Sequence, residues 1–277
     1  MLGIERRTRI VEGVAPDAIP YDTLMRDQQP VILKGVARDW PLVQCGVKSP
    51  TAAMDYIASF YSGRPVVGYH CAPEEGGRYF YTDQVDGFNF ERSRVQLPDF
   101  LDRIRAHLGD PDAPSFYIGS TDLDTYLPGL RNENDLVLND PMFETSRPLV
   151  SIWMGNHTIA SAHYDMSNNL ACCMVGKRRF TLFPPDQVAN LYPGPLEPTP
   201  GGQVVSMVDF RAPDLDRFPR FADAMAAGEV AELEPGDVLF YPALWWHNVE
   251  GIGDFTAMIN YWWNTSPAFM DTPQNTL

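Results

Sequence analysis

The sequence predicts a mainly β fold of the α+β kind, with an antiparallel sandwich or barrel in its C-terminal half. Its 25 prolines and 21 glycines among 277 residues favour short strands joined by turns over long helices. From about residue 148, short apolar segments follow one another closely, as they do in sandwiches and barrels. A hydrophobic fraction of 44%, with 12% aromatic residues, is enough for a sizeable core.

The first 147 residues mix predicted helices with short strands. Residues 30–36 (PVILKGV) are a β-rich run that begins at a proline. Residues 49–63 and 97–109 each combine a proline near the start, apolar residues at helical spacing and a final glycine, which predicts two helices. Residues 116–121 (FYIGST) predict a further strand. We therefore expect an N-terminal α/β elaboration over residues 1–147.

The C-terminal half predicts a succession of short strands. The turn signature EPGD at 234–237 separates two of them, and residues 184–192 and 214–228 are expected to be helical insertions. The nine expected strand segments are 149–156, 161–166, 168–176, 178–185, 204–210, 229–233, 237–242, 245–251 and 255–263.

Composition limits the classes of partner. The balance of 21 basic and 36 acidic residues gives a net charge of −15, which makes nucleic acid an unfavourable main partner. No apolar run approaches the roughly 18 residues of a membrane span, and the first residues lack the apolar core of a signal peptide. The four cysteines show no zinc-binding spacing and are expected to be reduced thiols. We expect a cytoplasmic protein without a membrane partner.

A basic triplet stands out in the stretch GKRRFTLFPP at 176–185. Alternation along a strand places Arg178 on the same side as Phe180 and Leu182, so we expect this arginine to face inward. Lys177 and Arg179 then belong to the solvated face. An inward guanidinium costs several kcal/mol unless an anion meets it, which indicates an anion-binding position.

Two histidines and an aspartate could form a metal site. His163 and Asp165 lie two residues apart in AHYD, so on a strand they project from one face with Cα atoms about 6.5–7 Å apart. His247 follows a later strand and could supply a third ligand. Two histidines and one carboxylate form the facial triad of non-haem Fe(II) oxygenases. From spacing alone, packed or surface histidines remain an open alternative, and His157 is a rival that we interpret as a loop residue.

These motifs carry a family resemblance. The half from 148 to 265 resembles the JmjC, or cupin-like, Fe(II)/2-oxoglutarate oxygenases, and within them it looks most like the asparaginyl hydroxylase that acts on hypoxia-inducible factor. The N-terminal stretch at 31–41 also looks like the opening of this family. The matching stretches are AHYD (162–165), Asn169, FPPDQ (183–187), LYPGP (191–195), VDF (208–210), RFP (217–219), PGDVL (235–239), WWH (245–247) and NYW (260–262).

The resemblance implies a double-stranded β-helix (jelly-roll) core at 148–265, a short tail at 266–277, and one JmjC/cupin-like domain over 1–277. It also implies Fe(II), 2-oxoglutarate and O2 as metal and co-substrates. The residues to which it assigns roles are His163, Asp165 and His247 as iron ligands, Arg178, Tyr117, Asn169 and Asn260 around 2-oxoglutarate, and Trp262, Tyr164 and Trp153 in the substrate pocket.

Two positions depart from the family pattern. Arg178 stands where the family usually has a lysine that pairs with the distal carboxylate of 2-oxoglutarate, and arginine can also clamp a carboxylate. Val204 and Val205 stand where the asparaginyl hydroxylase has Arg-Gln, which holds the target amide.

The function we expect is therefore hydroxylation of a C–H bond on a protein or peptide side chain, with the acidic surface receiving a cationic segment. An oxygenase acting on a small molecule or an RNA base is a second hypothesis, although the acidic charge disfavours RNA. A cupin-type metal protein without oxygenase activity is a third. The sequence leaves the oligomeric state open.

Overall fold

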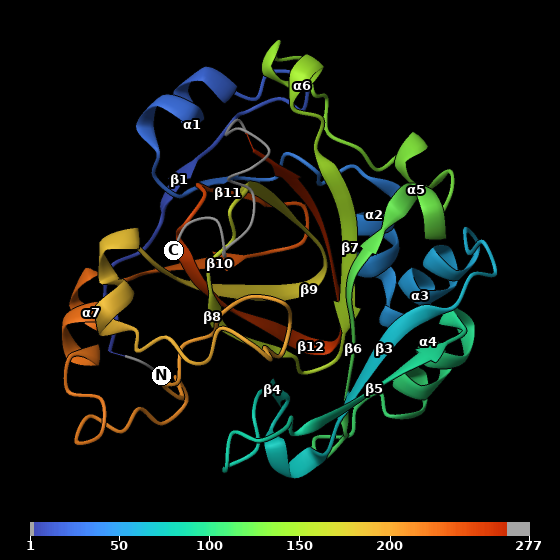
Figure 1. Cartoon of the computed structure of the whole chain (residues 1–277). Helices are drawn as coiled ribbons and strands as arrows, with labels where there is room; N and C mark the ends of the chain where they lie inside the picture. Colours follow the sequence, from blue (N-terminus) through green and yellow to red (C-terminus); the bar gives the residue numbers. More distant parts are fainter. Residues whose placement is uncertain (1–2, 265–277) are drawn as a thin grey trace.

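The computed structural model describes residues 3–264 of the chain, and the expected tail at 266–277 lies outside the described residues (Figure 1). The helices are α1 (Tyr21–Asp27), α2 (Pro41–Lys48), α3 (Pro50–Ala58), α4 (Leu97–Ala106), α5 (Leu123–Tyr126), α6 (Met142–Thr145) and α7 (Phe221–Ala227), with 3-10 turns η1 (Pro73–Glu75), η2 (Leu130–Asn132) and η3 (Pro185–Asn190). The strands are β1 (Arg9–Val11), β2 (Val31–Leu33), β3 (Val66–Cys71), β4 (Arg78–Tyr79), β5 (Phe90–Val95), β6 (Ser115–Asp122), β7 (Leu149–Gly155), β8 (Ile159–His163), β9 (Asn168–Phe183), β10 (Glu229–Leu233), β11 (Val238–Tyr241) and β12 (Trp246–Trp263).

Two long strands, β9 and β12, bend so that each contributes to two facing sheets. The first half of β9 and the second half of β12 lie in the major sheet, whose strand order is β1-β2-β11-β9-β12-β7-β6-β3-β5. Their other halves pair with β10 and β8, and β4 joins β8, which gives the minor sheet β10-β9-β12-β8-β4. This arrangement confirms the predicted jelly-roll core with N-terminal helices and strands around it (Figure 1).

A kink at Gly176 changes which residues of β9 face the interior. Before it, Ala171 and Cys173 pack in the cluster between the two sheets, and after it Phe180 and Leu182 belong to the same cluster. The inward residues are therefore odd-numbered before the kink and even-numbered after it. Gly176 has φ +67°, and a Cβ there would lie 2.8 Å from Thr256 Cγ2 and 2.9 Å from the Phe255 carbonyl oxygen. Glycine permits both the conformation and the close approach.

Helices cover the outer faces of both sheets. α3 and α4 were predicted from their caps and apolar spacing, and both predictions are confirmed. The Ser49 hydroxyl accepts a hydrogen bond of 3.0 Å from the Ala52 amide at the start of α3, which satisfies one of the free amides of the first turn. α3 buries Met54 and Ile57 against the major sheet, while α7 buries Phe221 and Ala224 against the minor sheet.

The sequence-based strand boundaries need three corrections. The segments 168–176 and 178–185 are one continuous strand, β9, because Gly176 bends the chain without ending the sheet pairing. Likewise, 245–251 and 255–263 form the single strand β12. Residues 204–210 are not a regular strand, since only Val205 and Ser206 make isolated β-bridges. The helical insertion at 184–192 is present as the 3-10 turn η3, and the one at 214–228 contains α7.

The four cysteines are unpaired, in agreement with the expected reduced thiols. None of the helices between residues 3 and 264 has the length and hydropathy needed to cross a bilayer.

Candidate metal centre and adjoining cavities

The two histidines of the predicted triad lie side by side on neighbouring strands of the minor sheet. His163 ends β8 and His247 is the second residue of β12, and the two are direct partners in the strand register with ring centroids 4.3 Å apart. Each ring contacts a carbonyl oxygen two residues earlier, His163 Nδ1 with Ser161 at 2.8 Å and His247 Nδ1 with Trp245 at 2.9 Å. A carbonyl can only accept, so both Nδ1 atoms carry the proton and both Nε2 atoms keep a free lone pair.

Asp165 completes the group from the turn after β8. Its side chain is buried, and its Oδ2 lies 3.5 Å from His247 Nε2 without accepting a hydrogen bond of proper geometry. One ligand atom from each of the three residues lies within 4.8 Å of the others, and this is the one such cluster within residues 3–264. A carboxylate oxygen and two imidazole nitrogens are therefore close enough together to share one metal ion.

Protonation in this buried group suits metal binding. Burial, together with the neighbouring His247, lowers the pKa of His163 to about 4, so its imidazole is neutral at pH 7. Burial alone would raise the pKa of Asp165, but the two histidines hold it below its ordinary value and keep the carboxylate ionised. Neutral imidazoles and an ionised carboxylate are the forms that bind metals.

The other three histidines lie elsewhere. His157 has φ +48° in the loop between β7 and β8, as predicted, and lies 3.8 Å from Asp254. His70 packs its ring on Phe116, and His107 lies 3.5 Å from Asp110. None of them belongs to the triad cluster.

Arg178 faces inward as predicted, and it lacks a carboxylate partner among the described residues. The residue is 3% exposed, its Nε makes no hydrogen bond, and its Nη2 makes only two long contacts of 3.5 Å, with the Trp153 carbonyl and Thr256 Oγ1. Burial lowers the pKa of the guanidinium, but the group remains charged at neutral pH. A buried cation of this kind is costly without an anion.

Its neighbours in the sequence turn outward, in agreement with the predicted solvated face. Lys177 Nζ pairs with Glu234 at 2.8 Å, and Arg179 pairs with Glu232 at 3.1 Å.

A cavity of about 40 Å³ inside the jelly roll is lined by both Arg178 and the triad. Two further buried N–H groups line it without a hydrogen-bond partner, Asn260 Nδ2 and Trp262 Nε1. Together with Arg178 Nε, they give three unused donors around a space with one positive charge. Buried donors in native proteins are nearly always satisfied, so these groups leave this space suited to an anionic ligand.

The remaining predicted residues around this cavity are held by short hydrogen bonds. Asn260 Oδ1 accepts from Trp153 Nε1 at 2.6 Å, which leaves the Asn260 amide nitrogen free. Asn169 Nδ2 donates to the Tyr241 hydroxyl at 2.6 Å, which leaves its carbonyl oxygen unpaired beside the triad. Tyr117 from β6 lines the cavity opposite β9, and burial raises the pKa of its hydroxyl, so the group stays a neutral donor.

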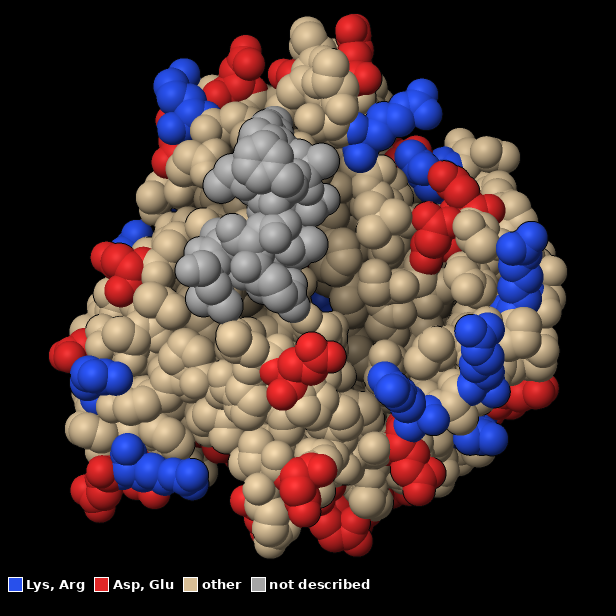
Figure 2. All heavy atoms as spheres, viewed as in Figure 1, with Lys and Arg blue, Asp and Glu red and all other residues tan. Residues whose placement is uncertain are grey.

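A wider cleft of about 240 Å³ opens from this cavity towards solvent, with Tyr117, Trp153, Ala160 and His163 common to both. Its outer wall is aromatic and comes from β3, β4 and β5, with Tyr69, Tyr79 and Phe90 in mutual ring contact. Apart from His163, the lining contains no titratable side chain other than tyrosine. In the view of Figure 2, a hollow with mainly uncharged walls lies near the centre of the molecule.

The structure corrects the expectation for Tyr164. This residue packs on Trp246 with ring centroids 4.9 Å apart, in the cluster outside the minor sheet, and it does not line the cleft or the cavity. Adjacent residues of an extended chain point to opposite sides, so His163 and Tyr164 cannot both face the interior. The other two expected pocket residues, Trp153 and Trp262, line the cavity, with ring centroids 5.5 Å apart.

The sequence interpretation missed Tyr241 and the aromatic wall. Tyr241 pairs with Asn169 in the strand register, and its alternation with Leu239 on β11 could have placed it inside. Tyr69, Tyr79 and Phe90 had no such signal, because β3, β4 and β5 were not predicted as strands and reach the site only through tertiary pairing.

Comparison with known proteins finds one family over most of the chain. The family described as "Cupin-like domain" matches residues 16–269. Lysine-specific demethylase 8 of Xenopus tropicalis is 26% identical over 251 residues, covering 88% of this chain and 50% of that protein. Human HSPB1-associated protein 1 is 39% identical over 116 residues, covering 40% of this chain and 23% of that protein.

A third relative, tRNA wybutosine-synthesizing protein 5 of Danio rerio, is 32% identical over 127 residues, covering 46% of this chain and 33% of that protein. The matched region thus spans half or less of each of these three relatives. The more specific likeness to the asparaginyl hydroxylase stays a prediction.

Proposed function

Because the chain belongs to the family of cupin-like domains, we propose that it is an Fe(II)- and 2-oxoglutarate-dependent oxygenase that hydroxylates a C–H bond. The observation that carries the proposal is the pairing of two features in one cavity. A buried group of two histidines and one carboxylate lies at one side, and three buried N–H donors without partners lie around the other. A plain metal-binding cupin has no need for the second feature.

His163, Asp165 and His247 would hold the metal. They offer two imidazole nitrogens and one carboxylate oxygen, which is the donor set of Fe(II) oxygenases and leaves other coordination positions open. The unused lone pairs of the Asp165 carboxylate fit this role, since a buried carboxylate oxygen without a donor is otherwise unfavourable.

Arg178 would hold the distal carboxylate of 2-oxoglutarate, with Tyr117 as a second donor. The guanidinium is planar and can bind a carboxylate through two hydrogen bonds. Asn169 and Asn260 line the same cavity as Arg178 and the triad, and the free Asn260 amide nitrogen can donate to the carboxylate on the metal side. The Asn169 amide nitrogen is already bound to Tyr241, so Asn169 would take the same role only with that hydrogen bond exchanged. Trp153 fixes the Asn260 amide in the orientation that points its nitrogen into the cavity.

Iron(II) and 2-oxoglutarate, when bound, supply the activation of dioxygen, with conversion of 2-oxoglutarate to succinate and CO2. The chain contributes orientation and exclusion of water. Arg178 and Tyr117 fix the far end of the co-substrate, which limits its rotation. The aromatic wall around the cleft surrounds the entering substrate with apolar surface and keeps bulk water from the reacting carbon.

For the substrate, we propose a protein or peptide side chain. An open cleft with aromatic walls can admit a side chain from a larger molecule, and two relatives are named as a lysine-specific demethylase and a protein associated with HSPB1. The relative named for tRNA wybutosine synthesis keeps an RNA base as the second candidate. The net charge of −15 favours the first. We expect the protein to act in the cytoplasm.

The test is anaerobic addition of Fe(II) and 2-oxoglutarate, followed by admission of air. We expect a visible charge-transfer band without oxygen and slow release of succinate with it. Arg178→Ala should raise the 2-oxoglutarate concentration needed for half-maximal release by about 100-fold, because a buried charge pair contributes on the order of 3 kcal/mol. Arg179→Ala, an outward arginine next to it, is the matched control and should change this concentration less than twofold.

Absence of both the band and succinate would contradict the oxygenase proposal and favour a metal protein without this activity. If His163→Ala abolishes turnover while Arg178→Ala leaves the 2-oxoglutarate requirement unchanged, the role of Arg178 is wrong although the enzyme class stands.

A further inference from the structure

The major sheet ends beside the aromatic cleft in a strand with one free edge. β5 is the last strand in the order β6-β3-β5, and its register with β3 runs from Val95 opposite Val66 to Phe90 opposite Cys71 without a bulge. Between residues 3 and 264, no segment other than β3 forms a backbone hydrogen bond with residues 90–95. In an antiparallel pair every second residue turns its N–H and C=O groups away from the partner strand. One row of these groups on β5 is therefore available to another chain.

This edge is long enough to hold a segment of another protein. β5 has six residues, whereas β1, at the other end of the same strand order, has three. An extended segment can add to such an edge as a further strand, about 4.8 Å away. Main-chain hydrogen bonds then contribute affinity, and the side chains on both strands select the sequence.

One face of β5 is covered by helix α4. Val95 packs against the hydrophobic core. A Cβ at Gly68, a near neighbour of Val95 on β3, would lie 2.9 Å from the Val95 side chain and 2.7 Å from the Phe100 ring of α4. Because side chains alternate along a strand, the odd-numbered residues of β5 face the helix.

The other face of β5 continues the wall of the cleft. Phe90 lines the cleft, and Arg92 and Arg94 have the same parity along the strand. Their register partners on β3 are Tyr69 and Val67, which also line the cleft. The two arginines therefore lie on the cleft side of the edge strand. Figure 2 shows basic side chains beside the central hollow, on the side of the molecule where Figure 1 places β5.

Arg92 and Arg94 carry positive charge without a partner. Both are exposed, and neither makes a hydrogen bond, an ion pair or a ring contact within the described part of the chain. Glu91 has the opposite parity and belongs to the face towards α4. Asp83 and Asp86 lie in the loop before the strand and do not pair with either arginine. Two like charges, two residues apart on one face, favour opposite charges on a strand beside them.

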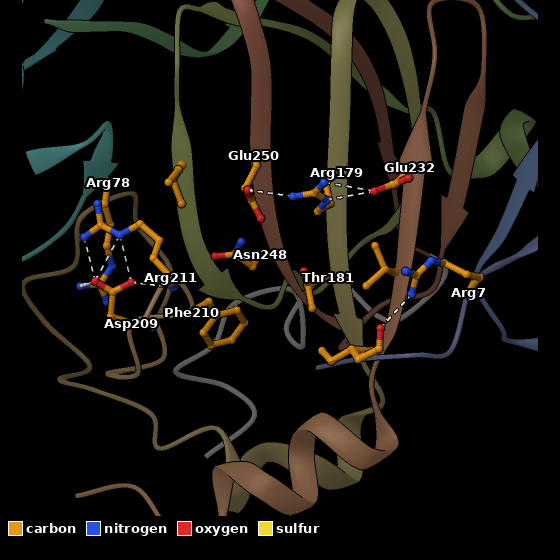
Figure 3. Close-up of a pocket in the computed structure, with 13 residues that line it drawn as sticks. Arg7, Arg78, Arg179, Thr181, Asp209, Phe210, Arg211, Glu232, Asn248 and Glu250 are labelled. Atoms are coloured by element: carbon orange, nitrogen blue, oxygen red, sulfur yellow. Dashed lines mark hydrogen bonds and ion pairs between the residues drawn. The ribbon is translucent and has the colours of Figure 1, made fainter. Parts of the chain in front are cut away.

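Arginines on the outer face of the minor sheet have carboxylate partners instead. Figure 3 shows Arg179 between Glu232 and Glu250, at 3.1 and 3.6 Å, and Arg211 bound to Asp209 at 2.7 Å. Arg179 has a strand on either side, and each of these strands supplies a carboxylate. The arginines of β5 differ because their strand has a neighbour on one side only.

A second copy of the chain fits this edge less well than an acidic segment does. Antiparallel pairing of two β5 strands about Ser93 would place Arg92 of one copy opposite Arg94 of the other. Like charges directly opposite each other destabilise a strand pair, whereas opposite charges stabilise it. Charged side chains on an edge strand in this way disfavour association of the protein with itself. An extended acidic segment satisfies both the free backbone groups and the two guanidinium groups.

We propose that the free edge of β5 docks an extended acidic segment of the protein substrate, with two acidic side chains, two residues apart, opposite Arg92 and Arg94. The segment adds a strand to the major sheet, and beyond Arg92 it passes Phe90 at the wall of the cleft. The inference rests on the proposed function only in taking the docked protein as the substrate. It differs from the cationic segment expected from the net charge of −15, because the charges nearest the cleft act on the partner more strongly than the total does.

The experiment is fluorescence anisotropy of the full chain with a labelled peptide of alternating glutamate and threonine, without Fe(II) or 2-oxoglutarate. We expect saturable binding that weakens at least tenfold when lysine replaces glutamate. N-methylation of every backbone amide, which removes the N–H donors and keeps the charges, should also weaken binding at least tenfold. Hydrogen exchange of the β5 amides should slow when the glutamate peptide is bound. Because no turnover is measured, failure of the oxygenase proposal would leave these results unchanged.

Variants of the chain test the two arginines. Arg92→Glu and Arg94→Glu should each weaken binding of the glutamate peptide at least fivefold. Arg103→Glu, the same charge change at an exposed residue of α4, is the matched control and should change it less than twofold. The peptide comparisons need no variant and serve if one fails to fold.

Five outcomes would overturn the proposal. The glutamate peptide does not bind, the lysine or the N-methylated peptide binds equally well, or Arg103→Glu costs as much affinity as Arg92→Glu. A uridine hexanucleotide that binds more tightly than the glutamate peptide would assign the edge to RNA. Protection of the β5 amides by self-association, without peptide, would assign it to a second copy of the chain.

Discussion

Replacing Arg178 by methionine should make the ligand-free protein more stable and insensitive to 2-oxoglutarate. The guanidinium is 3% exposed and has no carboxylate near it among the described residues, so the folded protein carries the cost of burying this charge. Methionine has a similar unbranched stem and fills irregular space without a charge. Both changes, the higher stability without ligand and the lost response to 2-oxoglutarate, follow from removal of the guanidinium.

The expected magnitudes can be worked out. Exchanging buried charged groups for apolar ones of similar size stabilises proteins by roughly 1–4 kcal/mol, and about 2 kcal/mol would raise the Tm of a chain of this size by about 4 °C. In the wild type, 2-oxoglutarate at about 100 times its Kd adds about 2.7 kcal/mol. If the variant binds about 100-fold more weakly, the same concentration adds only about 0.4 kcal/mol.

The assay is thermal unfolding under anaerobic Fe(II), with and without 2-oxoglutarate, followed by circular dichroism. Arg179→Met is the control, since it removes the same group from the next residue. Its ion pairs with Glu232 and Glu250 lie at the surface, where such pairs contribute about 1 kcal/mol or less. This variant should keep the full response to 2-oxoglutarate.

One result would refute the reasoning. If Arg178→Met lowers the Tm and retains the 2-oxoglutarate response, then the long contacts with Trp153 and Thr256 satisfy the guanidinium, and it serves the fold rather than an anion.

Three further predictions concern the metal, the kink in β9 and a buried carboxylate. Anaerobic Fe(II) at about 100 times its Kd should stabilise the wild type by about 2.7 kcal/mol in a thermal scan, whereas Asp165→Asn should lose this response and the exposed Asp186→Asn should keep it. Gly176→Ala should cost at least about 2 kcal/mol more in urea unfolding than Gly202→Ala, because both glycines have positive φ but only the first has atoms within 3 Å of a new Cβ. Burial raises the pKa of Glu229, so the carboxyl group of this residue stays protonated to a higher pH in the native protein than in the unfolded chain. The protonated carboxyl therefore adds stability at low pH, and this contribution is lost as the pH rises through the native pKa. Glu229→Gln should remove that component from the pH dependence of unfolding free energy, and an unchanged profile would contradict the assignment.

Alternation along the strands and short sequence motifs were sufficient to predict the residues at the centre of the candidate site. The AHYD motif supplies two potential ligands within three residues, with Asp165 just beyond the end of β8, and the parity of Phe180 and Leu182 predicts the direction of Arg178. Both inferences need only local geometry, because extended chains repeat every two residues. Tyr164 fails by the same rule, since it has the parity opposite to His163.

The walls of the cleft depend on pairings that no local pattern encodes. Tyr69 and Phe90 approach Tyr117 because β5 pairs with β3 and β3 pairs with β6, contacts between residues 19 or more positions apart. The strand β5 (FERSRV) is largely exposed and polar, so it lacks the apolar alternation by which strands are identified. Its place in the sheet follows from hydrogen bonding to β3 alone.

Because of the kink at Gly176, the site depends more on the number of residues in this part of β9 than on their types. Asn169 and Arg178 are an odd and an even residue of one strand, yet both reach the interior because the strand shifts its phase between them. Substitutions at the exposed Lys177 leave that phase intact. Loss or gain of one residue anywhere between Cys173 and Arg178 would invert it, moving the arginine to solvent and Arg179 or Lys177 into the barrel. Homologous chains with an inward arginine at this position should therefore vary in the residue types of this segment but not in its length.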